Sequence, residues 1–243
     1  MAAESIRIRD DHSLAERPLG RAHLTGVAPR AGRAVKEGPG VILHLEGLDL
    51  DLLGGVARRL ESWAGLRGWR VTRSSMTLHP DNSAPSSTRF PFHDPLAWPV
   101  VGREREWIEA HRRDLELFTE PAPGTLHLQC SGWLRTLACL RARGQGRLAE
   151  MLEAVGAEMP TPDHAFVLEG APGPPRLVLL DPDEGPDWPH LGRAFEARVA
   201  QELRAAAVEW NGARVLEANP GWGAAHYGLQ IESVLAREGK LDS

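Results

Sequence analysis

Residues 41–72 decide the fold, and they read VILHLEGLDLDLLGGVARRLESWAGLRGWRVT. The first five residues are a short apolar run bounded by glycines, which is typical of a buried strand. Apolar residues then recur three or four positions apart between Leu52 and Leu66, which predicts an amphipathic helix. Residues 69–72 predict a second strand. A strand, a helix and a strand within about 30 residues form a βαβ unit, and such units build parallel sheets.

The alternation of helices and strands continues along the rest of the chain. Further helices are expected at 107–118, at 132–156 (one helix, or a pair broken near Gly144 and Gly146), at 191–210 and at 227–235. Further strands are expected at 125–129, 165–168 and 214–216, with another candidate at 176–180, and residues 74–99 are expected to form a long surface loop. This order predicts one α/β domain over residues 40–243, with three layers, a mostly parallel central sheet and helices on both faces.

Residues 1–39 differ from this domain because they are polar, rich in arginine and punctuated by glycine and proline. We expect a solvated N-terminal extension that is partly disordered. The alternative is that its arginines bind an acidic partner.

The composition narrows the possible functions. Of the 243 residues, 42% are hydrophobic and 25% are charged, which excludes a disordered chain. The net charge of -5 gives no basic surface for nucleic acid, so no nucleic-acid partner is expected. No apolar stretch approaches the roughly 20 residues of a membrane span, so no membrane partner is expected. Cys130 and Cys139 lack the spacing of metal ligands, which predicts a cytoplasmic protein with neither a metal nor a disulfide.

Short motifs follow the predicted strands in an order known from one enzyme family. Residues 46–49 read EGLD after the first strand, residues 72–73 read TR after the second, and residues 162–169 read PDHAFVLE. From about residue 41 to 238 the chain resembles the thymidylate kinase family, whose first strand runs into a Glu-Gly-x-Asp loop, a phosphate-binding turn and a helix. The resemblance implies a P-loop kinase type of fold, and it implies a homodimer or a heterodimer with a related active enzyme.

The phosphate-binding loop departs from the family pattern where charge must be neutralised. Such a loop reads G-x-x-x-x-G-K-[ST]: backbone N–H groups wrap the phosphate, the lysine neutralises it and the hydroxyl holds Mg²⁺. Aligned from Gly47, the second glycine is Leu52, the lysine is Leu53 and the hydroxyl residue is Gly54. Asp51 adds a negative charge, and two unit charges roughly 4 Å apart repel by about 4 kcal/mol at an effective dielectric of ~20. The loop is therefore not expected to hold ATP phosphates.

Two further positions lack the charges that the family carries. Gln129 and Cys130 stand where the family has an Asp-Arg pair. Residues 181–187 match the family's arginine-bearing lid, but they are acidic and contain no arginine. Phosphoryl transfer depends on such cations together with Mg²⁺, so their joint loss argues against it.

The residues that remain as candidate ligand contacts are Glu46, Asp49, Arg73, Gln129 and Cys130. For Glu46 and Arg73 we favour a structural interpretation, in which they pair with each other or with backbone at the strand ends. A nucleophilic Cys130 would need a basic neighbour to lower its pKa, and His127 falls on the opposite strand face. We therefore expect a buried thiol at Cys130.

Histidines and aspartates around the predicted loop do not form a recognisable metal motif. The residues concerned are His79, Asp81, His93, Asp94 and His111. Because their spacing matches no set of metal ligands, we expect histidines scattered over the surface and the loop.

The sequence thus favours a pseudo-enzyme with no catalytic residue and no cofactor, which serves as a binding, regulatory or assembly module for a protein partner. Two alternatives stay open. One is an active nucleotide or nucleoside kinase that uses ATP and Mg²⁺ through Arg73 or the arginines of residues 1–39. The other is an enzyme of another class at the carboxyl ends of the strands, where open α/β sheets bind ligands. A carboxylate or Cys130 held beside a histidine would favour it.

Overall fold

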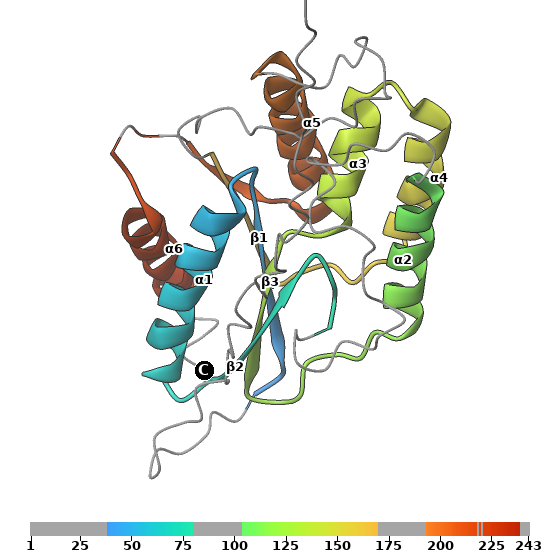
Figure 1. Ribbon diagram of the computed structural model, residues 1–243. Coiled ribbons are helices and arrows are strands. Elements are labelled where there is room, and N and C mark those ends of the chain that lie inside the picture. The colour runs from blue at the N-terminus through green and yellow to red at the C-terminus, as the bar shows by residue number, and fades with distance from the viewer. Residues whose placement is uncertain (1–37, 80–103, 170–192, 218, 220, 239–243) are drawn as a thin grey trace, which may run out of the picture.

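The computed structural model describes residues 38–79, 104–169, 193–217, 219 and 221–238. These residues form a central parallel sheet that is covered by helices on both faces (Figure 1). Most of the predicted extension, the candidate strand at 176–180 and the lid region at 181–187 lie outside the described residues.

The sheet has five strands within the described part of the chain, in the order β2-β3-β1-β4-β5, and all neighbours are parallel. They are β1 (Val41–Glu46), β2 (Arg70–Ser75), β3 (Thr125–Cys130), β4 (His164–Leu168) and β5 (Arg214–Leu216). Every residue of β1, β3 and β4 is buried, because helices cover both faces.

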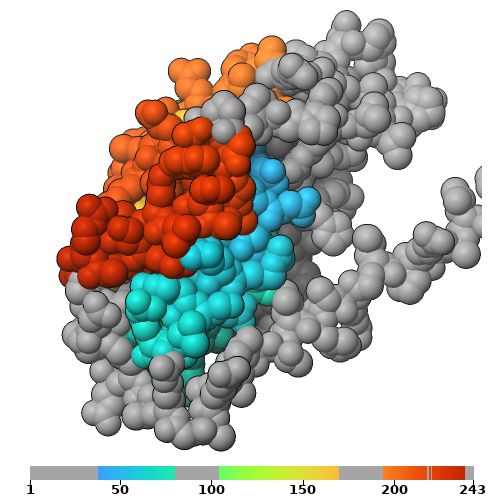
Figure 2. Space-filling model, turned by 90° about the vertical axis from the view of Figure 1, so that its left-hand side faces the viewer, coloured from blue at the N-terminus to red at the C-terminus, as the bar shows by residue number. Residues whose placement is uncertain are grey.

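Helices cover the two faces of the sheet in separate groups. On one face α1 (Leu50–Gly65) packs against α6 (Ala224–Glu238), and Figure 2 shows these two helices side by side on the outside of the molecule. On the other face α3 (Trp133–Ala142) packs against α5 (Arg193–Asn211) and α4 (Gly146–Gly156), and α2 (Glu104–Glu116) packs against α4. The α1 side and the α3 side of the sheet each hold a separate apolar core.

Most predicted elements are present near the expected positions. The expected break in the helical region 132–156 occurs at Gly144, whose φ of 72° is in the left-handed region that favours glycine. β2 is longer than predicted, since it continues to Ser75, and residues 76–79 are buried. The predicted surface loop at 74–99 is therefore wrong for its first six residues, and residues 80–99 lie outside the described part.

Of the helices in the described segments, none is both long enough and apolar enough to cross a membrane.

Candidate functional site

The candidate residues gather where β1 and β3 end beside each other. The register pairs His44 with Gln129 and Leu45 with Cys130, so Glu46 lies next to the turn that leads from β3 into α3. Ligands of open α/β sheets bind at this end of the strands. Two strand-to-helix connections, one after β1 and one after β3, therefore define the candidate site.

The connection from β1 to α1 is closed by its own carboxylate. It contains residues 47–49, because α1 begins at Leu50. Asp49 is the N-cap of α1, and its Oδ1 accepts hydrogen bonds from the backbone N–H groups of Asp51 (2.9 Å) and Leu52 (3.0 Å). N–H groups at a helix start are the groups that bind phosphate in other proteins. In this chain the N–H groups of Asp51 and Leu52 donate to the Asp49 side chain instead of to a phosphate. The residues after Asp49 form the first turn of α1 and not an open loop.

The positions that would neutralise phosphate charge carry no cation in the structure. Leu53, which the sequence pattern aligns with the lysine of a phosphate-binding loop, is 1% exposed and belongs to the apolar core on the α1 side. Leu52 is half-buried against the same core, Gly54 is half-buried and Asp51 is exposed. The side chains of the predicted degenerate loop thus serve the packing of α1.

Arg135 of α3 holds the same loop from its other side. This arginine is fully buried and donates hydrogen bonds to the backbone carbonyl oxygens of Gly47 (2.5 Å) and Leu48 (2.9 Å). A Cβ on Gly47 would lie 2.7 Å from the Leu168 carbonyl oxygen, so the loop is also pressed against the end of β4. The loop therefore presents carbonyl oxygens to a cation, whereas a phosphate loop presents N–H groups to an anion.

Glu46, at the end of β1, is 2% exposed. Its Oε2 lies 3.4 Å from His44 Nε2, and neither carboxylate oxygen accepts a hydrogen bond from the described residues. The Asn211 side-chain nitrogen, at the end of α5, lies 2.9 Å from His44 Nδ1. A carboxylate is thus held beside a histidine.

The connection from β3 to α3 carries backbone strain. Ser131 has a φ of 63°, which side-chain-bearing residues seldom adopt, and its buried Oγ has no hydrogen-bond partner among the residues described. Its N–H donates to the Leu45 carbonyl oxygen (2.7 Å), which fixes the turn against β1. Gly132 follows, and a Cβ there would lie 3.2 Å from Gln129 Nε2 and 3.7 Å from His44 Nε2. Strain of this kind is concentrated at ligand sites in folded proteins.

Gln129 and Cys130 point to opposite faces of β3. Gln129 Nε2 donates to the Thr77 carbonyl oxygen (3.3 Å) on the α3 side. Cys130 belongs to the apolar core on the α1 side, and it is buried and not in a disulfide. His127 hydrogen-bonds to Thr72, so the expectation that His127 does not face Cys130 is confirmed.

Arg73 is not part of the candidate site. The favoured pairing of Arg73 with Glu46 is not formed, because Arg73 lies on the α1 side of the sheet, where its Nε is 3.6 Å from Glu61 Oε2. Alternation along β2 explains the correction: Arg73 pairs in register with Leu128, which faces α1, whereas Glu46 contacts His44 on the α3 side. The kinase alternative named Arg73 or the arginines of residues 1–39 as phosphate contacts, and most of residues 1–39 lie outside the described part of the chain.

Two of the three histidines expected on the surface and the loop, His79 and His111, are buried, which corrects the prediction for them, while His93, Asp81 and Asp94 lie outside the described residues. His79 is 7% exposed and His111 is 1% exposed, and His111 Nε2 lies 2.9 Å from Thr136 Oγ1. Burial lowers the pKa of His111 to about 3. The pKa of His127 is lowered to about 4, mainly by burial and secondly by the charge of His79. His111 and His127 are therefore neutral near pH 7.

The sequence did not identify Arg135, His44 or Ser131 as part of this edge of the sheet. Arg135 occurs inside a helical apolar pattern and His44 inside an apolar strand, so neither breaks a periodicity. Within the described ranges, no three His, Cys, Asp or Glu side chains are grouped so as to hold a metal ion.

No protein-family model and no curated protein matches this chain. Among solved structures, its fold is similar to a thymidylate kinase from Candida albicans, with a TM-score of 0.54 and 12% identity over 85% of this chain and 95% of that one. A thymidylate kinase from Ehrlichia chaffeensis gives a TM-score of 0.49 and 14% identity over 82% and 99% of the two chains. The first similarity and the sheet order confirm the predicted α/β fold of the P-loop kinase type. The chain has a thymidylate kinase-like fold.

Proposed function

We propose that this chain is a catalytically inactive, thymidylate kinase-like protein that serves as a binding, regulatory or assembly module. The observation that carries the proposal is the closed loop between β1 and α1. Asp49 accepts hydrogen bonds from the N–H groups of Asp51 and Leu52, which a nucleotide phosphate would require.

Opening this loop for a phosphate would meet three separate costs. The Asp49 cap would be lost, which costs about 1 kcal/mol. The bonds from Arg135 to the Gly47 and Leu48 carbonyl oxygens oppose the backbone rotation that would turn N–H groups inward. Asp49 and Asp51 would then repel the phosphate, and the helix dipole returns only ~0.3–1 kcal/mol. These three costs argue against a nucleotide phosphate in this loop, and so they support a protein that does not transfer phosphoryl groups.

The proposed partner is a protein, either a second copy of this chain or a related active enzyme, as dimer formation in the thymidylate kinase family implies. Light scattering measures the mass of the purified chain in solution. A homodimer has twice the 26.6 kDa mass of one chain, whereas a chain whose partner is a different protein has the mass of a monomer.

Phosphoryl transfer from radiolabelled ATP tests the proposal. The purified chain is incubated with Mg²⁺ and each of dTMP, dUMP, AMP, GMP and CMP, and we expect no labelled product above a control without protein. The Asp49→Ala variant, in which the helix N–H groups are released, is also expected to be inactive, because Leu53 still stands at the lysine position. Mg²⁺-dependent transfer by the wild type would contradict the proposal. The Glu46→Gln variant is measured beside it, because an activity that belongs to this site should change when Glu46 is replaced.

A second candidate function is favoured by the contact between Glu46 and His44. A buried carboxylate 3.4 Å from an imidazole is an arrangement that can move a proton. Under this proposal the edge of the sheet supports acid–base chemistry of another enzyme class. The test is a screen for turnover of nucleosides and small esters, in which Glu46→Gln and His44→Gln must each abolish any activity that the wild type shows.

A further inference from the structure

Residues 76–79 form a short buried segment that crosses the carboxyl end of β3. Met76 has a φ of 65°, and its N–H donates to the Cys130 carbonyl oxygen (3.2 Å). The Thr77 carbonyl oxygen accepts the hydrogen bond from Gln129 Nε2 (3.3 Å). All four residues are buried. The segment therefore lies against Gln129, one of the candidate ligand contacts.

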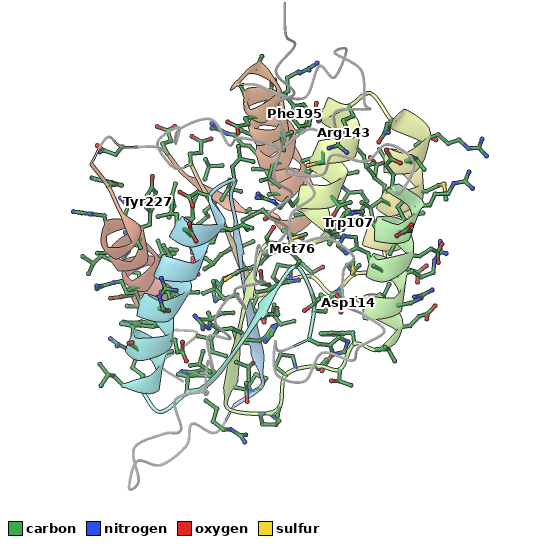
Figure 3. All side chains as sticks on the ribbon, viewed as in Figure 1. Met76, Trp107, Asp114, Arg143, Phe195 and Tyr227 are labelled. Carbon is green, nitrogen blue, oxygen red and sulfur yellow. The ribbon has the colours of Figure 1, made fainter. Side chains whose placement is uncertain are left out.

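Asp114 of α2 holds this segment from the opposite side. Its Oδ2 accepts a hydrogen bond from the Leu78 N–H (2.6 Å). His79 Nε2 lies 3.3 Å from the Asp114 carbonyl oxygen and 3.7 Å from Asp114 Oδ1, which has no hydrogen-bond partner in the described residues. Figure 3 shows Asp114 and Trp107 on the side of α2 that faces the sheet, with Met76 at the end of β2. Hydrogen bonds thus connect the segment to β3 on one side and to α2 on the other.

The hydrogen bond between the Leu78 N–H and Asp114 involves a carboxyl group that titrates near neutral pH. Burial raises the pKa of Asp114 to about 7, against the opposite effect of the Leu78 hydrogen bond. The titratable groups that face this region are His79 on the segment, His127 on β3, and His111 on α2. Further along, Glu104 of α2 accepts from Gln145 and interacts with Arg143. Neutral His127 and His111 supply no positive charge to Asp114 near pH 7.

The geometry points to a proton-dependent latch, in which the Asp114 carboxyl, bonded to the Leu78 N–H and lying beside His79, holds residues 76–79 over Gln129 and releases them when it loses its proton. With its proton, Asp114 carries no net charge in the buried contact. Without it, an uncompensated carboxylate remains in a buried position, and burial of a net charge is costly unless it is paired. Release of the segment would remove the Thr77 carbonyl oxygen from Gln129. The latch regulates the site of the proposed function, and its meaning for binding rests on that proposal.

The pH dependence of opening has a defined form. An Asp114 carboxyl that reaches solvent in the open state returns toward its ordinary pKa of about 4. The opening equilibrium then rises by up to roughly tenfold per pH unit from pH 4 to 7 and levels off above pH 7. The latch is therefore closed more firmly in acid than at neutral pH.

Hydrogen exchange of the Leu78 amide in the full chain, followed by NMR from pH 5 to 8.5, tests this inference. After correction for intrinsic exchange, we expect its protection to fall at least tenfold relative to the Leu43 amide between pH 5 and 7, and then to stay level. Asp114→Asn can still accept the Leu78 N–H but cannot titrate, so its protection should not change with pH. Asp163→Asn is the matched control, because Asp163 Oδ2 also accepts a backbone N–H, that of Ile42 (2.9 Å), from an exposed position. This variant should behave as the wild type.

Protection of Leu78 that is independent of pH in the wild type would overturn the latch, and so would an unchanged pH dependence in Asp114→Asn. Circular dichroism at each pH confirms that both variants are folded. The experiment contains no nucleotide and no partner, so its failure leaves the proposed function standing, and phosphoryl transfer by the chain would leave the latch standing.

Discussion

The two faces of β1 and β3 carry different chemistry at equal burial. On the α1 side the side chains are Leu43, Leu45, Leu126 and Leu128, and on the α3 side the same strands carry His44, Glu46, His127 and Gln129. The apolar face contributes folding free energy through burial, at about 25 cal/mol per Å². The polar face costs free energy wherever a buried group lacks a partner. The difference teaches that the α1-facing side chains of β1 and β3 serve apolar packing, while their α3-facing side chains include groups that packing alone does not require.

The largest expected effect compares neighbouring residues on the two faces. Leu128→Ala removes a fully buried side chain from the α1-side core and should lower the free energy of unfolding by about 2–5 kcal/mol. Gln129→Ala removes one hydrogen bond, to Thr77, and should cost about 1–3 kcal/mol. Urea denaturation at pH 7 measures both. A larger loss of unfolding free energy for Gln129→Ala than for Leu128→Ala would contradict this account, because the polar side chains of β3 would then stabilise the fold more than the apolar ones.

The second prediction concerns the response to acid of His111, a buried histidine of α2 that contacts Thr136 of α3. His111 has a folded-state pKa of about 3, below the value near 6.5 in the unfolded chain, so only the unfolded chain gains this proton as the pH falls below 6.5. Between pH 7 and 4.5 the wild type should therefore lose on the order of 2–3 kcal/mol of stability relative to His111→Gln.

Urea denaturation at both pH values measures this difference. Asp114, whose raised pKa acts in the opposite direction, is common to both proteins and cancels in the comparison. His226→Gln is the matched control, because His226 is exposed on α6 and should leave the wild-type pH dependence unchanged. Equal pH dependence in His111→Gln and the wild type would show that His111 is protonated in the folded state.

The smallest expected effect lies at the start of α1, in the connection that follows β1. Asp49→Ala removes the hydrogen bonds to the Asp51 and Leu52 N–H groups and should cost about 1 kcal/mol. Asp49→Asn keeps an acceptor at the cap and should cost less. Thermal denaturation measures the stability of both variants. Equal losses of stability in Asp49→Ala and Asp49→Asn would mean that the negative charge of Asp49, and not its hydrogen bonds to the helix N–H groups, stabilises α1.

The sequence predicts the elements of this fold well where periodicity is undisturbed. The strand at 214–216 and the helix break at Gly144 are confirmed, since glycine at a positive φ ends a helix wherever tertiary packing allows. The second strand was predicted too short, because Ser74 and Ser75 resemble loop residues while Ser74 is buried and bonded to His127. Such a contact between distant residues leaves no local signal.

The candidate site was predicted only in part for the same reason. Asp49 was assigned as a ligand contact, although an Asp directly before an apolar helical pattern is also the signal of an N-cap, and the structure shows that second role. The bonds of Arg135 to Gly47 and Leu48 join residues about 90 positions apart. The absence of a lysine at position 53 and of a hydroxyl residue at position 54 is readable in the sequence, but the closure of the loop is a property of the folded chain.

Binding of Mg-ATP tests the central claim most directly. The melting temperature of the wild type is measured with ATP up to 5 mM, in the presence and absence of Mg²⁺, alongside Asp49→Ala. The closed loop predicts no shift for the wild type. A nucleotide present at 100 times its Kd would stabilise the chain by about 2.7 kcal/mol and raise Tm by roughly 5–11 °C. A Mg²⁺-dependent rise of that size in the wild type would contradict the closed loop and restore the kinase alternative.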